Sequence, residues 1–169
     1  MKKTISKIFL LITLIFSMTA TALAGEFSVI DFNESPEDLL KKAPKTHMCG
    51  FSFVQPGYYV CILPEEETIF GEKSRSTCFN FYNQELYHIQ FNLIDNSFEK
   101  FKEIAYKLEK EYGKSESVDM SNEYQKVILI KWVKPDKTIM ITHYETKISK
   151  HKTTDINIIR PQQSKESNL

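Results

Sequence analysis

A change of hydrophobic period between residues 78 and 113 does most to limit the folds open to this chain. Apolar and polar side chains alternate over residues 85–93, as they do in a strand with one buried face. Residues 78–82 are predicted to pair with this segment, and Asn83 between the two tolerates the left-handed backbone that a tight reversal requires. An antiparallel hairpin is therefore expected here, directly before a helix.

A helix is predicted between Asn96 and Gly113, where the apolar period becomes 3.6 residues. Asn96 and Glu99 stand at the spacing of a capping box, and Gly113 stands where a C-cap belongs. At about 100° per residue, the apolar side chains occupy an arc of about 120°. They are Phe98, Phe101, Ile104, Ala105, Leu108 and Tyr112. A helix with one apolar stripe has to bury that stripe against another layer.

Further β-rich segments flank this unit on both sides. They are bounded by turn residues, and they lie at residues 51–55, 58–63, 124–133 and 138–144. Residues 155–159 are expected to add an edge strand, and Ser35-Pro36 should begin a short helix that ends near Lys42. The order hairpin, helix, hairpin predicts an α+β fold, a two-layer sandwich in which one long amphipathic helix packs on one face of an antiparallel sheet.

The first 24 residues have the three parts of a cleavable secretory signal. Three lysines give a positive start, residues 8–16 are apolar, and residues 22–24 read Ala-Leu-Ala, a pattern that signal peptidase recognises. The apolar run is shorter than the roughly 20 residues of a spanning helix. Cleavage is expected before Gly25, followed by a single α+β domain over residues 25–161 and a disordered polar tail over residues 162–169. The expected location is periplasmic or secreted.

The charge balance argues against a nucleic-acid partner. Removing the signal takes three lysines from the 22 basic groups and leaves all 22 acidic groups, so the formal net charge becomes −3. Acidic and basic residues are interspersed, and so weak a net charge gives no long-range attraction for nucleic acid. The partner expected for the mature chain is another envelope or secreted protein, and no cofactor is expected.

The three cysteines suggest one disulfide and one remaining thiol. Cys49, Cys61 and Cys78 all follow the signal, and an oxidising compartment favours a bond between two of them. Three pairings are open. In an ideal hairpin around Pro56-Gly57, Ser52 lies opposite Cys61, and Cys49 then falls beyond the roughly 7 Å Cα distance that a disulfide spans. A bond between Cys49 and Cys61 therefore requires an irregular entry to that hairpin.

The sequence carries no recognisable catalytic motif. Neither G-x-S-x-G nor H-E-x-x-H occurs, and the few glycines do not form a phosphate-binding loop. A non-enzymatic protein is therefore predicted. The alternative is a small-ligand or copper-binding protein with His47, Met48 and Cys49 as ligands, because imidazole, thioether and thiolate all bind copper. His88 is predicted to be a packed or solvated residue on the polar side of its strand.

Tyrosines supply the remaining functional signal. The chain has eight of them, and four are expected to have one side in water: Tyr58, Tyr59, Tyr82 and Tyr106. Tyrosine joins a large apolar area to a polar tip, which suits protein interfaces. The sequence therefore favours an exported binding protein that acts through protein contacts, of the inhibitor, immunity or envelope-assembly accessory type.

Overall fold

The computed structural model describes residues 32, 34–42, 47–51, 57–64 and 66–161, with only the backbone described for 47–49 and 51. The predicted signal (1–24) and polar tail (162–169) lie outside these residues. The two described helices are α2 (Pro36–Lys42) and α3 (Phe98–Tyr112). The described strands are β1 (His47–Phe51), β2 (Tyr58–Leu63), β3 (Glu67–Ile69), β4 (Glu72–Tyr82), β5 (Glu85–Leu93), β6 (Glu116–Asp119), β7 (Gln125–Val133), β8 (Thr138–Thr146) and β9 (Lys152–Ile159). None of the helices in this part of the chain is long and apolar enough to cross a membrane.

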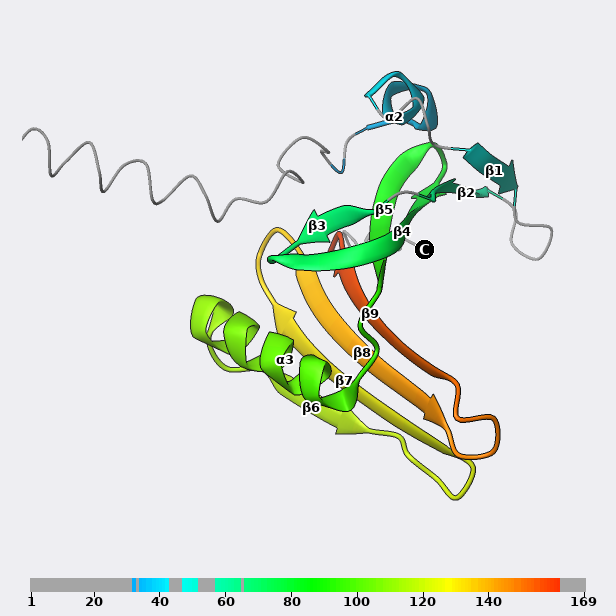
Figure 1. The fold of residues 1–169 in the computed structure, drawn as a ribbon. Coiled ribbons are helices and arrows are strands. Elements are labelled where there is room, and N and C mark those ends of the chain that lie inside the picture. Colours follow the sequence, from blue (N-terminus) through cyan, green and yellow to red (C-terminus); the bar gives the residue numbers. More distant parts are fainter. Residues whose placement is uncertain (1–31, 33, 43–46, 52–56, 65, 162–169) are drawn as a thin grey trace, which may run out of the picture.

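The predicted fold class is wrong. All described strands belong to a single antiparallel sheet in the order β1-β2-β4-β5-β9-β8-β7-β6, with β3 paired to β4. The two helices are short, so the molecule is mainly sheet and is not a two-layer sandwich around one long helix. In Figure 1, α3 lies beside β7 and β8 and α2 lies near the far ends of β4 and β5, so each helix accompanies only part of the sheet.

The position of β9 explains the difference. The last strand was expected at an edge, but it pairs with β5 on one side and with β8 on the other. Ile156 stands between Phe91 and Ile141 in this arrangement, and all three side chains are fully buried. The hairpins before and after α3 are therefore joined through β9 into one continuous sheet.

The sheet has a core face and an open face. Cys61, Phe79 and Ile89 follow one another across β2, β4 and β5 on the core face, Ile156 on β9 shares that face opposite Phe91, and all are buried. The residue next to each of these along its strand points to the opposite face, because successive side chains of a strand alternate between the two faces. We call this opposite face the open face. None of the described helices lies on that open face, yet most of its side chains are only half-buried to buried.

The helix ends are fixed by local hydrogen bonds. The α2 N-cap is Ser35, whose Oγ accepts from the Asp38 backbone at 3.2 Å, as expected. The predicted capping box of α3 is wrong by one residue, because Ser97 is the N-cap and accepts from Lys100 N at 3.2 Å. The Asn96 side chain instead accepts from Thr154 N at 2.7 Å and links the helix entry to β9. Gly113 is the C-cap, which confirms that prediction.

A buried histidine lies between α3 and β9. His143 on β8 is fully buried, its Nδ1 lies 3.0 Å from Thr154 Oγ1, and the rings of Phe98 and Phe101 lie 5.2 and 5.6 Å from its own. Burial lowers the pKa of His143, and Lys126 lowers it further, while Glu145 opposes the shift. The imidazole is therefore neutral at physiological pH.

This histidine should make the fold sensitive to acid. Because its pKa in the folded state lies below that in the unfolded chain, the unfolded chain binds more protons, and the free energy of unfolding should fall as pH drops below about 6.5. His88, whose pKa is also lowered by burial, acts in the same direction, while Asp155, whose pKa is raised by burial, opposes both at lower pH.

Urea denaturation at several pH values tests this expectation. The free energy of unfolding should change less steeply with pH in His143→Gln than in the wild type. The same change at the exposed His151 should leave the slope unaltered, and equal slopes for both variants would contradict the assignment.

Candidate functional site

Three tyrosines meet at one end of the open face. The rings of Tyr58 on β2 and Tyr82 on β4 lie 4.8 Å apart, and the ring of Tyr87 on β5 lies 5.7 Å from Tyr58 in an edge-to-face arrangement. Tyr82 is 47% exposed, while Tyr58 and Tyr87 are half-buried. We call Tyr58, Tyr82 and Tyr87 the tyrosine cluster.

Strand register and two turns bring this cluster together. Tyr58 lies directly opposite Tyr82 in the ladder, which places both side chains on the same face. Asn83 adopts a positive φ of 49°, as its sequence position predicts, and its backbone N donates to Gly57 O at 2.9 Å. A Cβ on Gly57 would lie 2.7 Å from Asn83 Oδ1, and φ there is +86°, so the turn requires glycine. The turn preceding β2 is thus packed against the turn that follows Tyr82.

A polar patch continues from the tyrosine cluster across β4, β5 and β9. His88 Nε2 lies 2.8 Å from Asn157 Oδ1, and His88 Nδ1 lies 3.3 Å from Asn80 Nδ2. Asn92 donates to Ser76 Oγ at 2.9 Å. Asn157 is only 6% exposed although none of the described helices covers this face. We call Ser76, Cys78, Asn80, His88, Gln90, Asn92, Asp155 and Asn157 the polar patch.

Burial shifts the pKa of four ionisable groups on this face toward their neutral forms. Burial lowers the pKa of His88, although its bond to Asn157 acts in the other direction. Burial raises the pKa of the Cys78 thiol and that of the Tyr87 phenol. It also raises the pKa of Asp155, which nearby Arg75 partly offsets. The shifts of His88, Cys78 and Tyr87 favour their neutral, hydrogen-bonding forms, and the Asp155 carboxyl lies near the positive charge of Arg75.

Among the described side chains of the polar patch, no nucleophile is paired with a base. The polar contact of Cys78 Sγ is with Asn92 Nδ2 at 3.7 Å, and the partners of His88 are two amides. A raised thiol pKa keeps Cys78 protonated, whereas a nucleophilic cysteine requires a lowered one. This geometry suits recognition better than acyl transfer.

Two of the four predicted interface tyrosines lie elsewhere. Tyr59 is on the core face, where its ring packs 6.3 Å from Phe81. Tyr106 is 59% exposed on α3, with Lys110 Nζ 4.4 Å above its ring. Because α3 lies on the core side of the sheet, Tyr106 does not join the tyrosine cluster. Tyr87 was not among the predicted interface residues. The register of β4 and β5 shifts beside it, so simple alternation of side chains predicts the wrong face of the sheet for Tyr87.

The cysteines are constrained by strand register. Cys61 lies opposite Phe79 and Ile62 lies opposite Cys78, so Cys61 and Cys78 point to opposite faces and are not bonded to each other. The β1 ladder is irregular: His47 pairs with Ile62 and Gly50 pairs with Val60. The backbone of residues 48–49 therefore lies opposite Cys61, and the ideal pairing that we expected for this hairpin is wrong. The Cys49 side chain lies outside the described residues, and its disulfide stays a prediction.

The copper alternative falls on side chains that are not described. His47, Met48 and Cys49 belong to β1, of which only the backbone path is given at these positions. Among the described residues, no group of three or more His, Cys, Asp or Glu side chains is placed to hold a metal ion.

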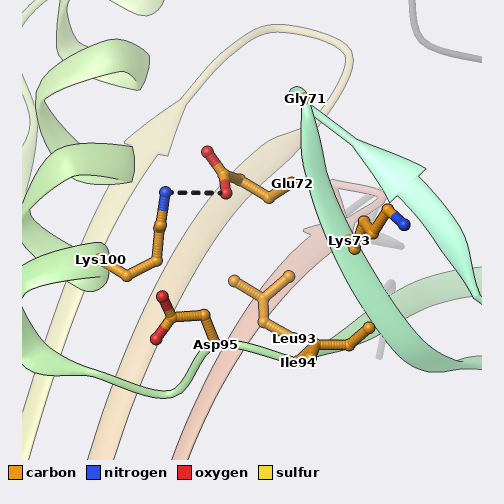
Figure 2. A pocket seen from close by; sticks show the side chains of 7 residues that line it. All are labelled: Gly71, Glu72, Lys73, Leu93, Ile94, Asp95 and Lys100. Carbon is orange, nitrogen blue, oxygen red and sulfur yellow. Dashed lines mark ion pairs between the residues drawn. The ribbon is translucent and has the colours of Figure 1, made fainter.

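A hollow lies between the start of β4, the segment after β5 and the start of α3. It encloses about 250 Å³, and Figure 2 shows the residues around it: Gly71, Glu72, Lys73, Leu93, Ile94, Asp95 and Lys100. The Glu72 carboxylate points across it to Lys100 Nζ at 3.3 Å. The hollow is thus closed on one side by an ion pair.

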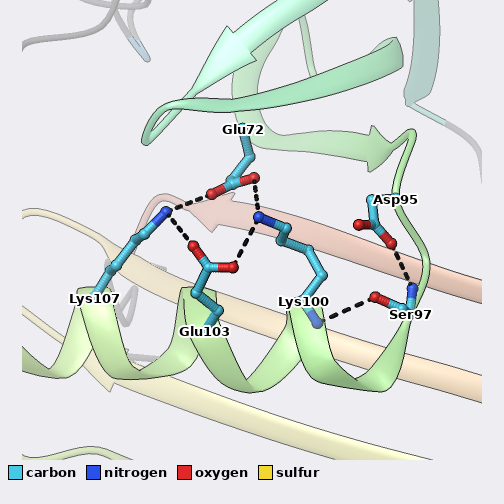
Figure 3. A network of polar contacts seen from close by, with 6 residues as sticks. All are labelled: Glu72, Asp95, Ser97, Lys100, Glu103 and Lys107. Carbon is cyan, nitrogen blue, oxygen red and sulfur yellow. Dashed lines mark hydrogen bonds and ion pairs between the residues drawn. The ribbon is translucent and has the colours of Figure 1, made fainter.

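That ion pair belongs to a network of four alternating charges. Glu72 contacts Lys100 and Lys107, and both lysines also contact Glu103, at distances between 2.7 and 3.3 Å (Figure 3). The hydrogen bond from Lys100, followed by the hydrogen bond and the charge of Lys107, lowers the pKa of Glu103 to about 2. Acids and bases in the network balance, and its contacts join α3 to β4. We therefore interpret this hollow as structural and take the open face as the candidate site.

Comparisons with protein-family models, with curated proteins and with solved structures found no match to this chain.

Proposed function

We propose that this chain is an exported, non-enzymatic binding protein that holds another protein on the open face of its sheet. The tyrosine cluster is the observation that carries the proposal. Three tyrosines from three strands share one face, and the one at the turn is 47% exposed. Tyrosines are enriched at protein interfaces and, with tryptophan and arginine, dominate their binding energy.

The distribution of charge on the open face supports a protein partner. The polar patch offers amide, hydroxyl and imidazole groups, while the pairs Glu85–Arg160 and Glu116–Lys131 lie at opposite margins. Interface cores are depleted of charged residues and their rims are polar. The open face resembles this arrangement, with tyrosine rings beside a centre in which amide, hydroxyl and imidazole groups predominate.

Single tyrosine substitutions test the proposal. The chain from Gly25 onward is immobilised and used to capture partners from the envelope fraction of its own source, and the affinity of a stoichiometric partner is then measured. We expect Tyr58→Ala and Tyr82→Ala each to weaken this binding by about 10–100-fold, as at interface hot spots.

Tyr106→Ala provides the matched control. It removes the same kind of side chain, which is comparably exposed but lies on the helix side of the sheet. Binding should be unchanged in this variant. Equal loss in all three variants, or unchanged binding in the two cluster variants, would contradict the placement of the interface.

A further inference from the structure

Large apolar side chains are exposed together at one tip of the sheet. Ile148 in the β8–β9 turn is 81% exposed, Tyr124 just before β7 is 60% exposed, and Met120 just after β6 is 51% exposed. The two loops that carry them protrude side by side at the lower right of Figure 1. Ile148, Tyr124 and Met120 are called the apolar tip. The apolar tip lies beside the start of β7, whereas Val133 lies at the end of that strand. The tip is also remote from the tyrosine cluster.

The two loops are fastened to each other. Lys147 N donates to Tyr124 O at 2.9 Å, and Lys147 Nζ donates to Asn122 O at 2.7 Å. The β8–β9 turn is closed further by Thr146, whose backbone N donates to His151 O at 2.9 Å and whose Oγ1 accepts from His151 N at 3.1 Å. Ile148 therefore projects from a hydrogen-bonded turn.

Basic groups surround the apolar tip. Residues 147–152 include three lysines and a histidine and no acid. Lys152 is paired with Glu145 at 3.1 Å, whereas Lys150 has no ion pair among the described residues. The acids of the facing loop are Asp119, which accepts from Ser121 N, and Glu123. Lys126 also lies near Asp119, although its Nζ stands 3.1 Å from the centre of the Phe98 ring. With Glu145 included, this region holds four lysines and three acids.

We propose that the apolar tip docks on an anionic phospholipid surface. Ile148, Tyr124 and Met120 would enter the boundary between head groups and acyl chains, with Lys147 and Lys150 at the level of the phosphates. Exposed apolar side chains beside lysines are the combination that binds such surfaces, and tyrosine is favoured at this depth.

A protein partner fits the apolar tip less well. A specific protein interface buries about 800 Å² on each side. An aromatic side chain buries roughly 150–250 Å², and only one of the three is aromatic, so three side chains on two narrow turns fall short of that area. Insertion into a lipid surface requires no matching partner surface around the tip.

Co-sedimentation with vesicles tests the proposal. The chain from Gly25 onward, which retains every residue of the described fold, is mixed with vesicles of phosphatidylcholine alone or of equal parts phosphatidylcholine and phosphatidylglycerol. We expect binding to the anionic vesicles that weakens with added salt. Ile148→Asp should reduce it by about 10–100-fold, since it removes one buried apolar side chain and adds a negative charge. Lys150→Glu should reduce it by roughly 10-fold or more.

Two variants away from the tip serve as controls. Val133→Asp places the same change at an equally apolar, 62% exposed position at the other end of β7, and Lys114→Glu reverses an exposed charge after α3. Both should bind vesicles as the wild type does, and circular dichroism should show all four variants folded. Wild-type binding that is equal for both vesicle types, or equal losses at Val133 and Ile148, would overturn the proposal. So would a soluble protein partner that binds without lipid and is lost in Ile148→Asp.

Discussion

Ile156→Asp is expected to abolish cooperative folding, whereas the same substitution at Val118 is expected to be tolerated. Ile156 is fully buried on β9 between Phe91 and Ile141. An isolated carboxylate at that point has no partner and would either remain charged at a large cost or be protonated at the expense of stability. We expect a loss of about 4–5 kcal/mol or more, a large part of the 5–15 kcal/mol by which domains are usually stable.

Val118 offers the matched comparison because β6 is the last strand of the sheet. Its side chain is 43% exposed, so an aspartate there stays in water and should cost less than about 1 kcal/mol. Urea denaturation followed by circular dichroism measures both changes. A cooperative transition in Ile156→Asp close to that of the wild type would place β9 at an edge, as the sequence had suggested, and would reject the strand order β5-β9-β8.

Trp132→Ala is expected to destabilise the protein by about 3–5 kcal/mol, as large-to-small changes in cores do. Trp132 is 1% exposed, lies opposite Ile139 on the core face, and donates through Nε1 to Gly113 O at 3.0 Å. The indole thus packs in the core and also holds the C-terminal end of α3 to β7. Its removal leaves a cavity and frees the helix end.

Trp132→Phe separates the two contributions. Phenylalanine keeps much of the ring volume but cannot donate to Gly113 O, so we expect a loss of about 1–2 kcal/mol. Val133→Ala, next to it and 62% exposed, should stay within about 0.5 kcal/mol of the wild type. Circular dichroism is the suitable probe because Trp132 is the single tryptophan of the chain. An alanine variant within 1 kcal/mol of the wild type would show that the core tolerates the cavity.

Strand alternation, turn residues and helix caps were predictable from the sequence because each depends on residues close together in the chain. The alternation over residues 88–93, the left-handed Asn83 and the Gly113 cap are all confirmed, whereas the alternation breaks at Tyr87. Each follows from side-chain period or from backbone preference within a few residues. The same reasoning placed Tyr58 and Tyr82 beside turns, and the structure adds that they face each other across β2 and β4.

Long-range pairing could not be read in the same way. The pattern of residues 155–159 is that of a strand, but nothing in it distinguishes an edge from a position between β5 and β8. The irregular β1 ladder and the orientation of Tyr87 depend on local departures from alternation that only the partner strand decides. Asn96 fitted a capping box, yet its side chain bonds to Thr154 of a strand far along the chain. These pairings decided the fold class and completed the candidate site.

The central place of the last strand also sets the order of events during synthesis. A ribosome releases β9 only after every other described strand, so the halves of the sheet on either side of it cannot be joined until β9 has emerged. Sheets that depend on such distant pairings form slowly. Under the export proposed above, this delay would be useful, because a polypeptide that has not closed its sheet can still be threaded through a narrow channel. The topology would thus favour folding after transport over folding before it.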